Sequence, residues 1–364
     1  MANFDGRLKS NEIFAALFNM IISQQVFADN IKDTKSTLVD MARVDGSLYG
    51  DTKLYYSTDV LRSYAWGNDA EAENLLKLYR PKAPDCQAIR LDVFRQIPLT
   101  VDNYLSKRAW SDEGSFSSFN SVMLGWMRET KKVYDSTTYN AFIGTAVSPK
   151  ASENISIDVT TAVGDAKGEE KARIEAGVIG EGIANLLVNL EDISRDYNDY
   201  GNLRSYSADD LVFVWNSEAV SKIEKRDLPT IFHKEIVDKF AQYTLPARYF
   251  GTVNAQSKTG DGATIRSLIE QDVKKASSPD IHVFAGDLIP NGYSAAANTT
   301  YTVDKTVLFK VYHKGPNSVP YMSAFEVGTS FFNPKSLTEN HYLTFGHNTL
   351  EYLKNYPFIT VKQA

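Results

Sequence analysis

The chain has 364 residues, of which 43% are hydrophobic and 23% are charged, a balance typical of a globular protein with a sizeable core. Its net charge of −6 argues against a protein that wraps nucleic acid through a generally basic surface, but leaves room for a local basic face. The single cysteine, Cys86, excludes an intrachain disulfide. Because no run of 18 apolar residues occurs, we expect no membrane-spanning helix.

The first part of the chain predicts an amphipathic helix followed by two strands. Apolar residues recur at helical spacing over residues 11–27 and form one stripe, which suits packing on the chain itself or on a neighbour. Residues 53–66 and 88–105 alternate apolar and polar side chains, as β-strands do. The polar stretch between them, 67–87, predicts a projecting two-stranded arm. Such an arm needs a surface to lie on, because an exposed hairpin is only marginally stable.

One very long helix is predicted from Ser115 to Gly144. Apolar residues recur there at intervals of three and four, the period of one helical face. We expect Ser115 to cap its start and Gly144 to end it in a left-handed turn. A rod of about 40 Å spans a domain and suits its backbone, although the pattern also fits an ordinary long core helix. Its polar residues predict a solvated or contact face, formed by Arg128, Lys131, Lys132 and Asp135.

The remainder of the chain alternates helices and strands and then becomes β-rich. Apolar spacing predicts a helix over about 175–195, and the continuous apolar run 211–216 predicts a buried strand. The alternation over about 170–290 favours a compact mixed α/β domain. From about residue 294 to the end, alternating side chains indicate strands.

Motifs for catalysis or cofactor binding are incomplete. Gly180 and Gly182 resemble the start of a dinucleotide loop, but Asn185 stands where the third glycine belongs, so we expect a helix with packing glycines. Residues 195–202 begin like a calcium loop but lack its later oxygen ligands, so they predict a turn. The five histidines have no metal-binding spacing. These patterns predict no cofactor and no metal site, while a catalytic site assembled from residues distant in the sequence stays open at this point.

Charged residues of both signs gather in the predicted arm. Such an arm is a poor nucleic-acid clamp, but it suits pairing with a mixed-charge surface on another subunit, where charge complementarity sets the register. A solvated loop is the alternative. Together with the amphipathic segment, the arm supplies the candidate subunit-interface residues, which are Phe14, Phe18, Arg62, Lys77, Arg80, Lys82, Arg90 and Arg95.

The order and wording of these parts resemble a known family. The segments that carry the resemblance are RLDVFRQIPLTVDNYLSKRAW (90–110), SFSSFNSVMLGWMRETKKVYDSTTYNAFIGT (115–145), IGEGIANLLVNLEDISRDYNDYGN (179–202) and LVFVWNSEAVSKIEK (211–225). They are similar to tailed-phage major capsid proteins with the Hong Kong 97-type fold, in particular those of short-tailed phages. The resemblance implies an α+β fold with a long spine helix, a β-hairpin extended loop and a mixed α/β axial domain.

The resemblance also implies a division of the chain and a function. The implied parts are an N-terminal arm (1–48), the extended loop (49–108), a peripheral domain with the spine helix (109–168), the axial domain (169–293) and a β return to the peripheral domain (294–364). The implied function is a capsid protein that assembles into an icosahedral shell of hexamers and pentamers around a phage genome. The expected location is the virion capsid, and the host cytoplasm during assembly.

The implied partners are further copies of the chain, a scaffolding protein, a portal, minor capsid proteins and double-stranded DNA contacted without sequence reading, with no membrane. Three alternatives stay open at this point. The first is an encapsulin-type compartment shell, which shares the fold. The second is an enzyme with a nucleotide-binding α/β domain near 170–290, and the third is another structural protein of the virion.

Overall fold

The chain folds into two compact units, each assembled from segments distant in the sequence. The computed structural model describes residues 37–46, 51–64, 78–102, 113–219, 241–254, 280–283, 299–314 and 318–364. The first unit comprises Met1–Leu38, Arg95–Ser136 and Glu326–Phe345, and the second comprises Val39–Phe94, Thr137–Phe325 and Gly346–Ala364. Among the helices described, none is both long and apolar enough to cross a membrane.

The second unit contains a mixed five-stranded sheet in the order β4-β13-β10-β5-β6. Its central strands are antiparallel, whereas the outer strands β4 and β6 run parallel to their neighbours. All six residues of β5 are buried, as its continuous apolar run predicts. The strands are β4 (Asn154–Ile157), β5 (Leu211–Asn216), β6 (Ala241–Leu245), β10 (Val307–His313) and β13 (Phe358–Gln363).

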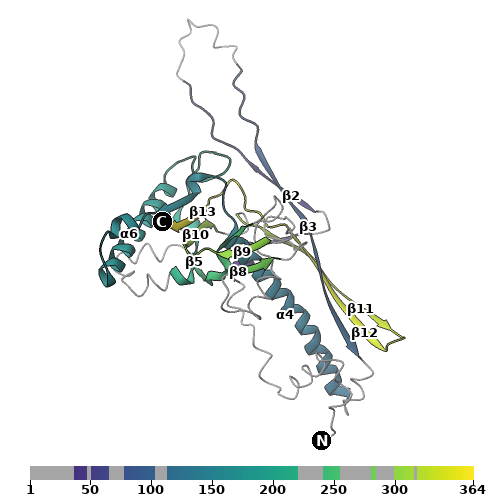
Figure 1. Ribbon diagram of the computed structural model, residues 1–364. Helices are drawn as coiled ribbons and strands as arrows, with labels where there is room; N and C mark the ends of the chain where they lie inside the picture. Colours follow the sequence, from purple (N-terminus) through teal and green to yellow (C-terminus); the bar gives the residue numbers. More distant parts are fainter. Residues whose placement is uncertain are drawn as a thin grey trace. The chain divides into compact units, whose positions relative to one another are not determined.

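Helix α6 (Gly168–Glu191) lies beside this sheet and closes its core (Figure 1). Ile183 and Leu190 of the helix are buried with Phe213 and Ile359 of the sheet. A helical stripe of this kind is what the spacing predicts, and each fully buried aliphatic side chain stabilises the fold by about 1.5–3 kcal/mol. A β-carbon placed on Gly182 would lie 2.8 Å from Ile157 Cδ1, so this glycine permits close packing on β4.

The sheet draws its strands from three of the parts expected from the sequence. β4 falls within 109–168 and β10 and β13 fall within 294–364, two stretches that were expected to form the peripheral domain. All three strands join β5 in the sheet that α6 covers, and the division of the chain into domains stays a prediction. The C-terminal β region is therefore divided between two sheets, because strand partners are set by the buried face and not by chain order.

Short elements complete the second unit. Three antiparallel strands form a small sheet in the order β7-β9-β8, which are Gly251–Asn254, Thr299–Val303 and Asp280–Val283. The short α-helices described are α2 (Thr37–Ala42) and α5 (Thr160–Val163). Three single turns of 3₁₀ helix, labelled η, are also described, namely η3 (Ala151–Glu153), η4 (Ala208–Asp210) and η5 (Ala247–Tyr249).

The predicted long helix is confirmed as α4, but the roles predicted for the residues at its two ends are wrong. It runs from Glu113 to Thr145, 33 residues or about 50 Å, so Ser115 lies inside its first turn and is not its cap. Gly144 is the penultimate helical residue and is not among the glycines with positive φ. A β-carbon at Gly144 would lie 1.9 Å from the carbonyl oxygen of Tyr249. Glycine is therefore required there by close packing and not by a left-handed turn.

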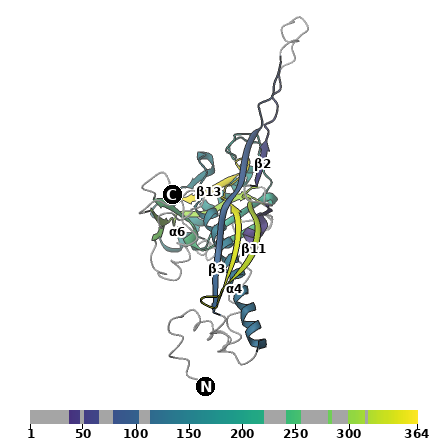
Figure 2. The same cartoon turned by 90° about the vertical axis from the view of Figure 1, so that its right-hand side faces the viewer.

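A third sheet has the order β1-β11-β12-β3-β2, and its long strands β3 and β11 can be followed in Figure 2. β2 and β3 pair antiparallel from Thr52↔Arg90 to Ser57↔Asp85, which confirms the two strands predicted on either side of the arm. The apolar side of β3 is buried, again as predicted, at Ile89, Leu91 and Val93. The strands are β1 (Arg43–Asp45), β2 (Thr52–Ser57), β3 (Asp85–Asp102), β11 (Tyr321–Asn333) and β12 (Thr338–Asn348).

Candidate functional site

The segment between β2 and β3, residues 58–84, is here called the arm. Its described parts, 58–64 and 78–84, form neither helix nor strand. They expose large apolar side chains, and the rings of Tyr64 and Tyr79 lie 4.4 Å apart, so the two sides of the arm meet there. Clustered exposed apolar side chains typically mark an interaction surface. With the outer face of β2, this apolar surface of the arm consists of Leu54, Tyr56, Val60, Leu61, Tyr64, Leu78 and Tyr79.

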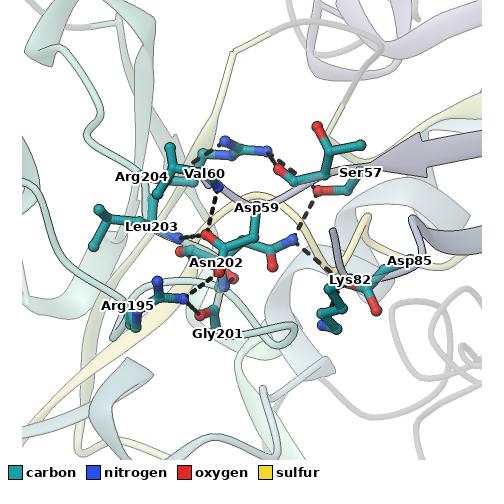
Figure 3. A network of polar contacts seen from close by, with 12 residues as sticks. Ser57, Asp59, Val60, Lys82, Asp85, Arg195, Gly201, Asn202, Leu203 and Arg204 are labelled. Atoms are coloured by element: carbon teal, nitrogen blue, oxygen red, sulfur yellow. Dashed lines mark hydrogen bonds and ion pairs between the residues drawn. The ribbon is translucent and has the colours of Figure 1, made fainter. Parts of the chain in front are cut away.

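The start of the arm is held by residues 195–204, here called the anchor loop (Figure 3). One carboxylate oxygen of Asp59 accepts hydrogen bonds from the backbone N–H groups of Leu203 at 3.0 Å and Val60 at 2.9 Å. The other oxygen forms an ion pair with Arg195 at 2.6 Å. The Leu203 N–H, together with Arg195, lowers the pKa of Asp59 to about 2. Asp59 is therefore charged at any pH near neutrality.

Arg204 and Asn202 hold the end of β2 from the same loop. The Arg204 guanidinium donates to the backbone oxygen of Thr58 at 2.6 Å and to the Ser57 hydroxyl at 3.3 Å. The Asn202 amide donates to the same hydroxyl at 3.0 Å and to Asp85, at the start of β3, at 3.4 Å. Both strands that flank the arm are thus tied to one loop, as Figure 3 shows.

A second segment, residues 349–355, holds β3. The Gln87 side chain donates to the backbone oxygen of Tyr352 at 3.1 Å and accepts from the Lys354 N–H at 3.0 Å. Further along the strand, Asp92 accepts from both the N–H and the hydroxyl of Thr349, at 2.7 and 2.8 Å. Repeated two-point contacts of this kind fix the direction of a strand more firmly than single bonds do.

The anchor loop keeps its shape through its own side chains. Asn198 is fully buried, and its amide closes a five-residue turn by accepting from the Asn202 N–H at 2.8 Å and donating to the Asn202 carbonyl at 2.7 Å. Gly201 has a φ of +66°, which glycine adopts readily, and its carbonyl accepts from Arg195 at 2.7 Å. The calcium-like pattern is therefore a turn, as predicted, and the Asn198 side chain hydrogen-bonds the backbone of that turn.

The predicted interface residues fall into three groups. Phe14, Phe18 and Lys77 lie outside the described residues. Arg62, Arg80, Lys82 and Arg90 are exposed, with Lys82 paired to Asp85 at 3.0 Å, and their contact with another subunit stays a prediction. Arg95 packs on its own chain, because its guanidinium lies 5.7 Å from the centre of the Tyr134 ring and its Nε is buried.

The polar face predicted for α4 is only partly exposed. Asp135 is 2% exposed and pairs with Lys131 at 3.1 Å, and the Lys131 ammonium lies 5.5 Å from the ring centre of Phe345 in β12. Of the two predicted alternatives, a solvated or a contact face, these two residues form a contact face within the chain, because strand β12 packs against that side of the helix. Arg128 is exposed and Lys132 is half-buried, and their contact role stays a prediction.

The part of the chain that the structure describes holds no group of three or more metal-ligating side chains. Gly180 and Gly182 lie within α6, several residues after its first turn, so they form no phosphate-binding loop. His347 is buried, stacks on Tyr321 and bonds the Asn348 carbonyl at 2.8 Å. These residues serve packing.

Sequence reasoning missed the residues that hold the arm. It selected charged arm residues for contacts with another subunit, whereas Asp59, Arg195, Asn202 and Arg204 act within the chain. The turn at 195–202 was a usable signal for the loop. The residue that this loop binds, Asp59, lies more than 130 positions earlier, and no local pattern in the sequence links the two.

The comparisons with known proteins agree with one another. A model of the Phi29-like phage major capsid protein family matches residues 5–361. A chain in the structure of the head fiber and inner core protein gp22 of native bacteriophage P68 is similar with a TM-score of 0.59 at 12% identity, over 89% of this chain and 83% of that one. A chain in the capsid structure of Staphylococcus phage Andhra gives 0.54 at 11% identity, over 88% and 82%. No curated protein sequence matches.

Proposed function

Because the chain belongs to the Phi29-like phage major capsid protein family, we propose that its copies form the hexamers and pentamers of an icosahedral shell around a phage genome. The match to the family over residues 5–361 carries this proposal, since it includes nearly the whole chain. The mixed α+β fold, similar to the P68 and Andhra chains, supports it. The chain is thus a structural protein of the virion capsid.

The fold we propose is of the Hong Kong 97 type. In that arrangement α4 is the spine helix, the arm with β2 and β3 is the extended loop, and the sheet of β4, β5, β6, β10 and β13 with α6 is the core of the axial domain. Residues 1–48 are then the N-terminal arm, and β11 and β12 return to the peripheral domain. The assignment is supported by the chain order of these elements.

The partners we propose are those of a shell that is built and then filled. A scaffolding protein, a portal and minor capsid proteins are expected during assembly in the host cytoplasm. Packaged double-stranded DNA is expected to meet the shell without base reading, because a chain of net charge −6 has no generally basic surface. We propose no catalytic activity and no cofactor.

The arm is the part of the chain that we propose to bind a neighbouring copy. Its apolar surface, which includes Leu61 at 77% and Leu78 at 78% exposed, gains stability only when another surface covers it. The arm root, residues 57–60, contacts the anchor loop, and these contacts limit the directions in which the arm can reach. Copies of one chain in hexamers and pentamers need contacts that are specific but adjustable, and an anchored arm provides them.

The alternatives from the sequence gain no support. An encapsulin-type shell shares the fold, but the family matched is that of phage major capsid proteins. A nucleotide-binding enzyme is disfavoured because Gly182 packs against Ile157 inside a helix. Nucleic acid or a cargo enzyme inside purified shells distinguishes the phage reading from the encapsulin reading.

The experiment is expression of the full chain followed by sedimentation and negative-stain microscopy. We expect closed shells, and a chain that stays monomeric with saturable nucleotide binding would support the enzyme instead. Leu61→Ser with Leu78→Ser should leave a folded subunit by circular dichroism that forms few shells. The matched control is Val188→Ser with Ile193→Ser, which removes two side chains of similar exposure, 67% and 64%, outside the arm. Equal shell yields from both double variants would contradict the role of the arm.

A further inference from the structure

Glu153 is a buried carboxyl that the contacts of the arm do not use. It ends the turn η3, directly before β4, and its exposed fraction is 0%. Within the described residues, neither of its carboxylate oxygens has a partner at full hydrogen-bond distance and angle, although the Ser148 hydroxyl and the Phe358 backbone lie close enough to favour its ionised form. Buried carboxylates are normally paired or hydrogen-bonded, because an unpaired charge in the interior is costly. Glu153 therefore fits this position in its protonated, neutral form.

Several polar groups surround this carboxyl, and they come from separate parts of the second unit. Burial is the main reason why the pKa of Glu153 is raised to about 7, and the other groups adjust that value in both directions. The groups that interact with it are Ser148 and Lys150 before η3, Asp199 in the anchor loop, Tyr206 after that loop, Tyr352, and the backbone of Phe358 in β13.

The two charged groups that interact with Glu153, Lys150 and Asp199, are already engaged in holding the anchor loop. The Lys150 ammonium donates to the backbone carbonyls of Arg195 and Asn198, the latter at 2.9 Å. The Asp199 carboxylate accepts from the Ser148 hydroxyl at 3.1 Å and from the Tyr352 hydroxyl at 2.8 Å. A negative charge on Glu153 thus repels Asp199, while the cation that would balance it is bound to the loop.

We propose that Glu153 is a proton-dependent switch that sets how firmly the anchor loop holds the arm. While Glu153 is neutral, Lys150 and Asp199 keep residues 195–199 in place. When Glu153 ionises, it attracts Lys150 away from the loop carbonyls and repels Asp199, so the loop loosens. The far end of the same loop, residues 201–204, carries the groups that bind Asp59 and Ser57, and the arm root is released with it.

The direction of the switch follows from linkage. The folded state binds the Glu153 proton more tightly than the unfolded chain does, since the pKa rises from 4.5 to about 7. The proton is therefore present at mildly acidic pH and is lost through neutrality. The arm root is held firmly below about pH 6 and loosely above about pH 8. The loosening of the arm root takes place within one subunit. Only its effect on shell assembly rests on the proposed function.

Hydrogen exchange of the full-length chain between pH 6 and pH 8 tests the proposal, with rates corrected for the intrinsic effect of pH and the assembly state recorded by sedimentation. In the wild type, protection of the Leu203 and Asn202 amides should fall about tenfold, the ratio that one pKa unit of coupling produces. The Phe213 amide in β5 should not change. Glu153→Gln, which cannot ionise, should keep both loop amides protected at pH 8.

Two further variants make the outcome decisive. Glu191→Gln, at the exposed end of α6, should retain the wild-type pH dependence. Asp199→Asn removes the charge that opposes ionisation of Glu153 and should move the midpoint to lower pH, which gives a second reading if Glu153→Gln folds poorly. A flat profile in the wild type, an unchanged profile in Glu153→Gln or an unmoved midpoint in Asp199→Asn would overturn the switch. None of these results depends on whether shells form.

Discussion

Gly144 lies where α4 passes closest to the backbone of the turn η5. A β-carbon there would be 1.9 Å from the carbonyl oxygen of Tyr249 and 2.5 Å from its carbonyl carbon. The obstacle is backbone and cannot rotate away. The turn is also fixed by its own bonds, from the Tyr249 N–H to Pro246 at 3.1 Å and from the Phe250 N–H to Ala247 at 3.0 Å. Gly144→Ala must therefore displace the helix or the turn by more than 1 Å, roughly, to reach ordinary contact.

The expected cost can be set against a control in the same helix. Overpacking of a well-packed site costs about 1–3 kcal/mol and more against rigid backbone, whereas alanine favours the helix by about 1 kcal/mol over glycine. Gly144→Ala should thus lower the free energy of unfolding by about 2 kcal/mol. Gly125 also lies in α4, and a β-carbon there would meet nothing within 4 Å. Gly125→Ala should raise the free energy of unfolding by up to about 1 kcal/mol.

Urea unfolding of the unassembled chain, followed by circular dichroism, measures both changes at constant slope. The reasoning predicts opposite signs and a difference of about 3 kcal/mol between the two variants. If Gly144→Ala is as stable as Gly125→Ala, the helix does not approach Tyr249 as described. Glycine would then stand at 144 for no structural reason.

Two further predictions concern buried polar side chains. Asn198→Ala removes the partners of the buried N–H and carbonyl of Asn202 and should cost about 2–3 kcal/mol in urea unfolding, whereas Asn185→Ala on the exposed side of α6 should change little. Burial lowers the pKa of Lys310 from 10.5 to about 7. The folded state therefore binds this proton less tightly than the unfolded chain does. As a result, the free energy of unfolding rises with pH between about 7 and 10.5. Lys310→Met should remove most of that rise, about 4 kcal/mol, and an identical pH profile in the variant would show that Lys310 titrates normally.

Local patterns predicted the elements that need only local information. The periodicity of α4, the continuous apolar run of β5 and the alternation in β3 each reflect which side of an element is buried, and all three are confirmed. The role predicted for Gly144 at the C-terminal end of α4 is wrong because glycine has two roles. A sequence alone does not distinguish a left-handed turn from a close approach to a backbone that lies about 100 positions away at Tyr249.

The pairing of the strands does not follow from the sequence pattern in the same way as the elements do. β13 lies between β4 and β10, so the last strand of the chain joins one that precedes α6. Nothing in the alternation of apolar residues says which strands pair, since any strand with one buried face meets the same requirement. The domain boundaries drawn at 168 and 294 followed changes of pattern along the chain, and the sheet crosses both.

The candidate site shows the same limit for polar residues. Arg62, Arg80 and Lys82 were selected because charge is visible in a sequence, yet the described parts of the arm also expose large apolar side chains, among them Leu61 and Leu78. Asp59 and Arg195 are equally charged residues whose role depends on a contact across 136 positions. Their type alone gives no reason to separate them from the exposed group.

The way in which the arm is held explains how it can be both directed and adjustable. The sheet under α6 is held by buried apolar side chains, whose loss would unfold the unit. The arm root is held by hydrogen bonds and one ion pair in partly exposed positions, and such contacts add little to global stability. They can therefore exchange partners without unfolding the sheet. An arm built in this way keeps one preferred direction in the free subunit and can still adjust, which is what contacts in the proposed hexamers and pentamers require.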